Sequence, residues 1–88
     1  MQNKRTKVLL IEDNKVDQLA FKRLVKEKNL SYDYTIAKTL SDSKKILDQE
    51  KFDVVIADYF LGDGTSLDIF ELISDCPIIV TTGLGDEK

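Results

Sequence analysis

The sequence contains no histidine, a single cysteine, one proline and four glycines among its 88 residues. Without histidine, the chain has neither a histidine acid–base catalyst nor a histidine metal ligand of its own. The lone Cys76 cannot form an intrachain disulfide, which is typical of proteins from a reducing compartment. No histidine is present to activate its thiol, so we interpret Cys76 as a small, half-buried hydrophobic residue beside Pro77.

Long apolar runs are also missing. No stretch approaches the roughly 20 residues of a membrane span, and the N-terminus lacks the apolar segment of a signal peptide. The net charge of −3 disfavours a nucleic-acid-binding surface, which requires a basic face. We therefore expect one cytoplasmic domain over residues 1–88, with neither a membrane nor a nucleic acid as its partner.

Short apolar segments, by contrast, recur regularly along the chain. Their spacing alternates between the patterns of buried strands and of amphipathic helices. Such an alternation indicates right-handed crossovers and a parallel sheet with helices on both faces. We predict strands over residues 7–11, 32–37, 52–57 and 78–82, helices over 16–28, 39–49 and 67–73, N-caps at Asn14 and at Thr39 or Ser41, and a loop over 59–66.

Acidic residues follow the two most apolar of these strands. Glu12 and Asp13 come directly after the first strand, and Asp58 follows the third. Carboxylates held close together repel each other, and a divalent cation such as Mg²⁺ relieves that repulsion. Ligands of open parallel sheets bind at the carboxyl ends of the strands. The pattern predicts an acidic metal site there, although the same acids could simply cap helices or solvate strand ends.

The last strand ends in hydroxyl groups at the same edge. Thr81 or Thr82 could donate a hydrogen bond to an oxyanion near Asp58, although threonine is also a good strand residue in its own right. Gly62 and Gly64 flank an acid and no lysine follows them, so we interpret this segment as a turn rather than a phosphate-binding loop.

Three segments, VLLIEDN at 8–14, DVVIADY at 53–59 and PIIVTTG at 77–83, together resemble the receiver domain of two-component response regulators. The resemblance covers essentially all 88 residues. It implies an α/β, flavodoxin-like parallel sheet with four strands in the order 2-1-3-4 and three helices. It also implies a histidine kinase or a histidine phosphotransfer domain as the partner, and no enzymatic activity beyond the chain's own phosphotransfer.

The resemblance also assigns roles to individual residues. Asp58 matches the phosphate-accepting aspartate and a metal ligand, Asp13 the direct Mg²⁺ ligand, and Glu12 the second acid, which usually acts through water. The backbone carbonyl of Phe60 matches the third protein ligand. Thr82 matches the switch hydroxyl that turns toward the phosphoryl group, and Gly83 matches the small residue after it.

The chain departs from the family pattern in three places. Gly62 stands where many receivers have proline, and Ser66 where they often have glycine. The sequence also stops after the fourth strand, so we expect a truncated receiver that lacks the last helix, strand and helix, together with the lysine and the aromatic residue of the fifth strand. We expect an exposed fourth strand as a consequence, with homo-oligomers formed through it or by exchange of elements.

Two other functions compete with phosphorylation. A truncated or degenerate receiver could serve as a non-catalytic interaction or dimerisation module. A metal-dependent phosphohydrolase also places its nucleophilic aspartate after a strand, but it usually needs a second acid two residues later, where this chain has Phe60. We rank the phosphohydrolase last for that reason.

Overall fold

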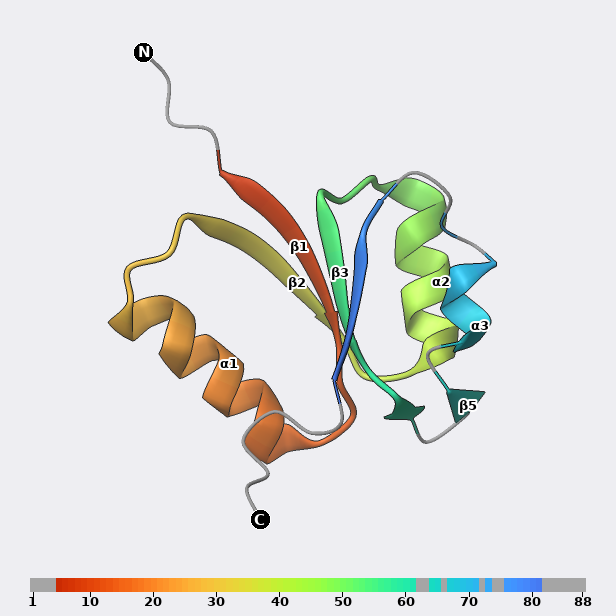
Figure 1. Ribbon diagram of the computed structural model, residues 1–88, viewed down its shortest axis with the longest axis horizontal. Coiled ribbons are helices and arrows are strands. Elements are labelled where there is room, and N and C mark those ends of the chain that lie inside the picture. Colours follow the sequence, from red (N-terminus) through yellow and green to blue (C-terminus); the bar gives the residue numbers. More distant parts are fainter. Residues whose placement is uncertain (1–4, 62–63, 66, 72, 74–75, 82–88) are drawn as a thin grey trace.

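A parallel sheet with helices on both faces forms the framework of the protein, as the computed structural model shows (Figure 1). The structure describes residues 5–61, 64–65, 67–71, 73 and 76–81. Its elements are β1 (Thr6–Ile11), α1 (Lys15–Glu27), β2 (Tyr32–Ala37), α2 (Leu40–Gln49), β3 (Val54–Asp58), β4 (Phe60–Leu61), β5 (Gly64–Thr65), α3 (Leu67–Phe70) and β6 (Ile78–Thr81).

The four main strands lie in the order β2-β1-β3-β6, and each neighbouring pair is parallel. Since β6 is the fourth strand of this sheet along the chain, the predicted order 2-1-3-4 is confirmed. The two central strands, β1 and β3, are those with continuous apolar sequences, as expected for strands covered on both faces. All four strands end at the lower side of Figure 1, which we call the carboxyl edge.

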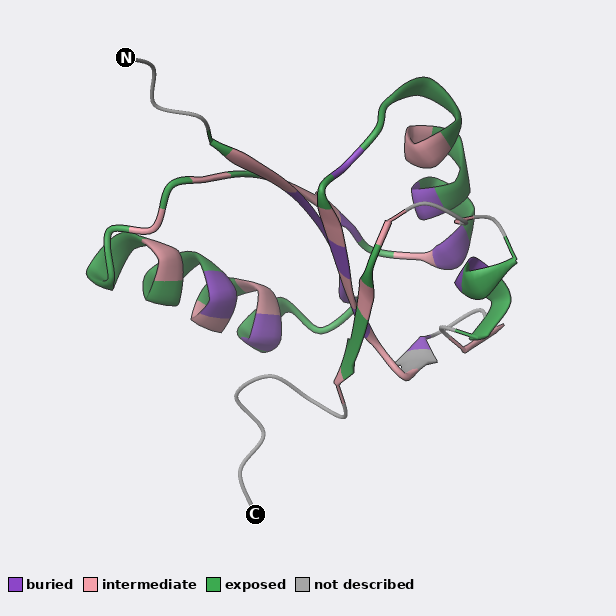
Figure 2. Ribbon diagram, turned by 45° about the horizontal axis from the view of Figure 1, so that its top comes forward, coloured by how far each residue is buried: buried purple, intermediate pink, exposed green. Residues whose placement is uncertain are grey.

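Alternation along β1 divides the core into two layers. Val8 and Leu10 pack with Phe21 of α1, whereas Leu9 and Ile11 pack on the opposite side. The second layer includes Leu40 of α2, Ile69 of α3, and Val55 and Ala57 of β3. Figure 2 shows the buried residues concentrated on the strands and on the inward sides of the helices. The helices therefore cover both faces of the sheet, as predicted.

Helix α1 begins and ends where the sequence predicted. The side chain of Asn14 accepts hydrogen bonds from the backbone N–H groups of Val16 and Asp17, at 2.8 and 3.2 Å. After the helix, Asn29 adopts a left-handed conformation with φ of 52°, which is a common way to end a helix. Both signals are local in the sequence, which explains why they could be read from it.

Only one of the two apolar stripes of α1 packs against the sheet. Phe21 is buried and contacts the rings of Tyr32 and Tyr34, at centroid distances of 6.5 and 5.3 Å. Three apolar side chains of the other stripe remain exposed: Val16, Leu19 and Leu24. The outer side of α1 is therefore an apolar surface.

The segment after β3 differs from the loop that the sequence predicted. Strands β4 and β5 pair as a short antiparallel hairpin, with Phe60 opposite Thr65 and Leu61 opposite Gly64. Leu61 is buried in the same core layer as Leu40 and Ile69, and this burial draws the segment against α2 and α3. The prediction of a loop over 59–66 was therefore wrong for these four residues.

The remaining elements match their predicted positions closely. Thr39, one of the two candidates, is the N-cap of α2 and accepts a hydrogen bond from Asp42 N–H at 3.0 Å. Helix α3 is shorter than predicted, although the N–H of Ile73 still donates to the carbonyl of Ile69 at 3.2 Å.

In the part of the chain described here, no helix has both the length and the apolar character needed to cross a membrane.

Candidate metal centre

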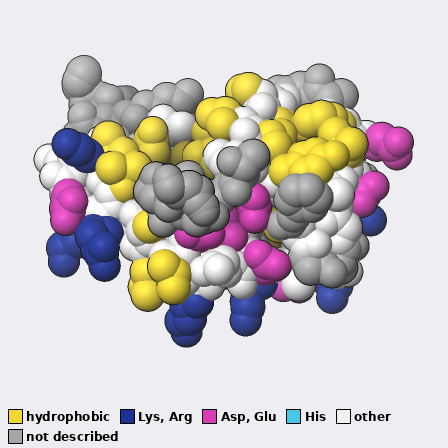
Figure 3. Space-filling view, turned by 60° about the horizontal axis from the view of Figure 1, so that its bottom comes forward, with side chains coloured by type: hydrophobic (Ala, Val, Ile, Leu, Met, Phe, Trp, Pro, Cys, Tyr) yellow, Lys and Arg dark blue, Asp and Glu magenta, His cyan; other side chains and the backbone are white. Residues whose placement is uncertain are grey.

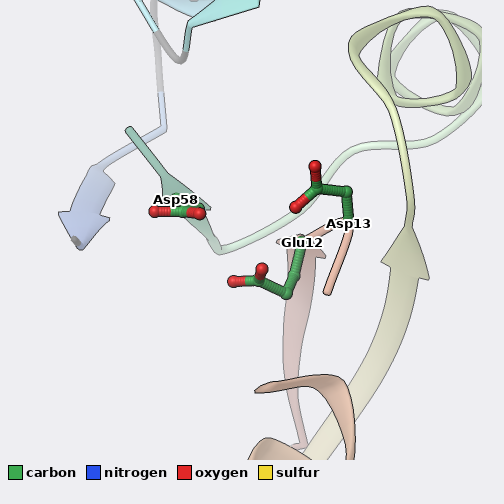
Figure 4. Close-up of side chains that lie close together, drawn as sticks. All are labelled: Glu12, Asp13 and Asp58. Carbon is green, nitrogen blue, oxygen red and sulfur yellow. The ribbon is translucent and has the colours of Figure 1, made fainter. Parts of the chain in front are cut away.

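Three carboxylates converge at the carboxyl edge of the sheet. Oxygen atoms of Glu12, Asp13 and Asp58 all lie within 4.8 Å of one another (Figure 4). The strand register explains this arrangement, because Ile11 of β1 pairs with Ala57 of β3. The residues that follow this pair are therefore placed side by side, although they are far apart in the sequence.

Glu12 is the most deeply buried of the three acids, with 0% of its surface exposed. Its Oε2 atom accepts a hydrogen bond from the backbone N–H of Asn14 at 3.1 Å. Its Oε1 atom is also buried and has no hydrogen-bond partner among the described residues. A buried carboxylate oxygen without a partner is costly, and a bound cation or its water would satisfy it.

The surroundings of Glu12 raise the pKa of its carboxyl group from 4.5 to about 7. Burial is the largest cause, because it disfavours the charged form. The negative charges of Asp58, Asp17 and Asp13 raise the pKa further, while the hydrogen bond from Asn14 opposes them. The fold thus places the Glu12 carboxyl group where its charged form is disfavoured.

The other two acids are more accessible. Asp13 is exposed and Asp58 is half-buried. Figure 3 views the molecule from the side of the carboxyl edge and shows acidic side chains near the centre of this face, with lysine and arginine side chains toward its periphery. An exposed and a half-buried carboxylate beside a buried one form an all-oxygen set, which suits a hard cation such as Mg²⁺. The residues present therefore fit the predicted metal.

The other predicted site residues have different outcomes. Phe60 is the first residue of β4, two positions after Asp58, and its role as a carbonyl ligand stays a prediction. Thr82 and Gly83 lie outside the described residues, as do Gly62 and Ser66.

Two residues of α1 that lie beside the site were not predicted from the sequence. Asp17 is buried, with 7% of its surface exposed, and its charge contributes to the raised pKa of Glu12. The side-chain amide of Gln18 donates to the carbonyl of Glu12 at 2.7 Å. Asp17 lies in the first turn of α1, so the predicted N-cap at Asn14 was a signal that could have placed it near the site.

Comparisons with known proteins agree with this fold. A scan against protein-family models finds no match, and neither does a search of curated proteins. Among solved structures, the non-phosphorylated HemR receiver domain from Leptospira biflexa is 30% identical, with a TM-score of 0.71 over 86% of this chain. A response regulator receiver protein from Pseudomonas putida is 24% identical, with a TM-score of 0.73 over 91% of this chain. The anti-anti-sigma factor PhyR from Bartonella quintana is 22% identical, with a TM-score of 0.67 over 90% of this chain.

The chain therefore has the flavodoxin-like fold of response regulator receiver domains, and the resemblance read from its sequence is confirmed. It spans only part of these proteins: 63% of the HemR domain, 69% of the Pseudomonas putida protein and 34% of PhyR. A further match, a fusion that contains a trimeric coiled coil of yeast Spc42, is covered over 54% of its length.

Proposed function

We propose that the protein is a phosphate-accepting receiver domain that uses Mg²⁺ and takes a phosphoryl group on Asp58. The observation that carries the proposal is the cluster of three carboxylates within 4.8 Å, one of which has a buried oxygen without a partner. The receiver fold supports it, because the cluster lies at the carboxyl edge where ligands of such sheets bind.

The chemistry is an in-line transfer from a phosphohistidine. A carboxylate oxygen of Asp58 attacks the phosphorus atom, an O–P bond forms and the P–N bond breaks. The electron pair of that bond stays on the imidazole nitrogen of the donor, and the product is an acyl phosphate on Asp58. Glu12, Asp13, Asp58 and the backbone carbonyl of Phe60 would hold the Mg²⁺, which when bound neutralises charge on the transferred oxygens.

The donor histidine must belong to another protein, because this chain contains none. We propose a histidine kinase or a histidine phosphotransfer domain, and we place the reaction in the cytoplasm. Val16, in the first turn of α1, has 67% of its surface exposed only three positions from Asp13, and it would give such a donor an apolar contact beside the site. The PhyR structure with the anti-sigma factor NepR is an example of a protein complex formed by a structural neighbour.

Intact-mass analysis after incubation with acetyl phosphate and Mg²⁺ tests this function. We expect the wild-type chain to gain the mass of one phosphoryl group, and the Asp58→Asn variant to gain nothing. An Asp33→Asn variant is the control, because Asp33 is exposed on β2, away from the carboxyl edge. Equal labelling of the wild type and Asp58→Asn would contradict the assignment of Asp58.

A second function, as a non-catalytic interaction module, is favoured by the exposed apolar residues of β6. Ile79 and Val80 have 50% and 39% of their surfaces exposed. Among the described residues, β6 pairs with β3 alone. We propose homo-oligomers formed through this strand. If that assembly is the main function, neither Asp58→Asn nor a beryllofluoride mimic of the phosphoryl group will change it.

A further inference from the structure

Two buried side-chain oxygens lack a hydrogen-bond partner in the described part of the chain, and both lie at the carboxyl edge. One is Oε1 of Glu12, which belongs to the metal centre. The other is Oγ1 of Thr81, the last residue of β6.

The strand register places Thr81 directly beside Asp58. The two residues are paired across β3 and β6, so their side chains extend from the same face of the sheet, with the strands about 5 Å apart. On the other side of β3, Glu12 follows Ile11, whose partner Ala57 precedes Asp58. The two unpartnered oxygens therefore flank Asp58 within one row across three strands.

The backbone of Thr81 is held firmly in this position. Its carbonyl accepts a hydrogen bond from the N–H of Tyr59 at 2.8 Å, immediately after Asp58. The hydroxyl group, in contrast, has no such hydrogen bond among the described residues. Burying it without a partner costs free energy that a valine of the same shape would not cost. A hydroxyl at this position is explained if a hydrogen-bond partner arrives when the site is loaded.

We infer that the Thr81 hydroxyl forms a hydrogen bond with a group bound at Asp58: it donates to a phosphoryl oxygen, or it accepts from a water on the cation. Both groups would be bound beside Asp58, next to the row that Thr81 ends. This role is separate from that of Thr82, and it rests on the proposed function. Thr81 would thus favour a phosphoryl group or a hydrated cation beside the nucleophile.

A comparison of Thr81→Val with Thr81→Ser tests the inference. The wild type and both variants are titrated first with Mg²⁺ alone by calorimetry, and then with beryllofluoride in the presence of Mg²⁺ by ¹⁹F NMR. We expect Thr81→Val to lose about tenfold in affinity for the ligand whose oxygen it contacts, which is the usual effect of one lost bond to a charged group. Thr81→Ser keeps the hydroxyl and should stay within about threefold of the wild type.

The two titrations identify the hydrogen-bond partner of the Thr81 hydroxyl. A loss seen already with Mg²⁺ alone assigns the bond to a water on the cation, whereas a loss seen only with beryllofluoride assigns it to a phosphoryl oxygen. The thermal midpoint of the ligand-free protein is a second measurement, and Thr81→Val should equal or exceed the wild type because an unsatisfied hydroxyl is removed. A structural threonine would show the opposite pattern, with a lower midpoint and unchanged ligand affinity.

Thr35→Val is the matched control, since it removes a strand hydroxyl from β2, away from Asp58. Wild-type affinity of Thr81→Val for both ligands would overturn the inference while leaving the proposed function intact, and so would an equal loss in Thr35→Val. If the wild type itself binds neither ligand, the proposed function and the inference both fail. Thr81→Ala provides the same readout if the valine variant does not fold.

Discussion

At the scale of single residues, the protein holds a buried carboxylate in an environment that disfavours its charge. Glu12 has 0% exposure, an oxygen without a partner and three acidic neighbours that raise its pKa. Burying the charged carboxylate destabilises the metal-free fold. A bound cation would offset this cost, because it favours the charged form. Glu12 is therefore the residue where stability and metal binding oppose each other most directly.

The pH dependence of stability tests this opposition. The pKa of Glu12 rises from 4.5 in the unfolded chain to about 7 in the folded one, so the folded state binds the extra proton between these values. The contribution of Glu12 to the free energy of unfolding is fully present at low pH, and it is lost as the pH rises through about 7. Without metal, urea unfolding of the wild type should show stability falling from about pH 5 to about pH 8, and Glu12→Gln should flatten this fall.

Mg²⁺ should reverse the pH dependence of the wild type's stability. The cation favours the ionised carboxylate, so it should stabilise the wild type more as the pH rises, and Glu12→Gln much less. Glu71→Gln, at an exposed position after α3, is the control. A pH profile of Glu12→Gln that matches the wild type would show that another group governs the dependence.

The convergence of the acids could be predicted from the sequence, but their environment could not. Glu12, Asp13 and Asp58 follow apolar strands, and this local pattern suffices to place them at one edge. The burial of Asp17 depends on which stripe of α1 faces the sheet, and two apolar stripes compete for that position. The unpartnered hydroxyl of Thr81 depends on strand register, which a single sequence does not fix.

At the scale of elements, capped helices and apolar strands were predictable, whereas the hairpin was not. The N-caps Asn14 and Thr39 are residue types that hydrogen-bond locally, and β2 has the alternation typical of a strand. Strands of two residues are too short to show a period, so β4 and β5 left no signal. Their position is decided by tertiary contacts with α2 and α3.

Gly64 is the residue that permits this hairpin. Its φ is +149°, and a Cβ atom there would lie 2.6 Å from Leu40 Cδ1 and 2.8 Å from Asp68 Oδ2. Leu40 is buried and cannot move freely, so we expect Gly64→Ala to lower the free energy of unfolding by about 1–3 kcal/mol. Urea denaturation followed by circular dichroism measures this change.

Thr65→Ala, in the same strand, is the control for the substitution. It removes side-chain atoms instead of adding them and leaves the glycine in place. If Gly64→Ala costs less than about 0.5 kcal/mol, the close approach of β5 to α2 is not required for stability.

At the scale of the whole molecule, the described residues leave large apolar side chains exposed on three elements. These are α1, with Leu19 and Leu24, α3, with Leu67 and Phe70, and β6, with Ile79 and Val80. Within the described part of the chain, β6 pairs with β3 on one side only, and exposed apolar residues on such a strand favour association. We therefore predict that the protein forms a dimer or larger assembly at micromolar concentration.

Size-exclusion chromatography with light scattering measures the mass in solution. Ile79→Lys should shift the protein toward the monomer, because a charge on an edge strand opposes pairing. Leu67→Lys is the control, since Leu67 is similarly exposed, at 49%, but lies on α3. A wild-type protein that stays monomeric would refute association through β6.

The central claim is that Glu12, Asp13 and Asp58 bind one divalent cation together. Paramagnetic broadening by substoichiometric Mn²⁺, a stand-in for Mg²⁺, tests this claim most directly in NMR spectra of the protein. We predict selective broadening of the amide signals of these three residues, with Mg²⁺ competing it away and Asp13→Asn abolishing it. Broadening centred on other acidic residues, or unchanged in Asp13→Asn, would contradict the account.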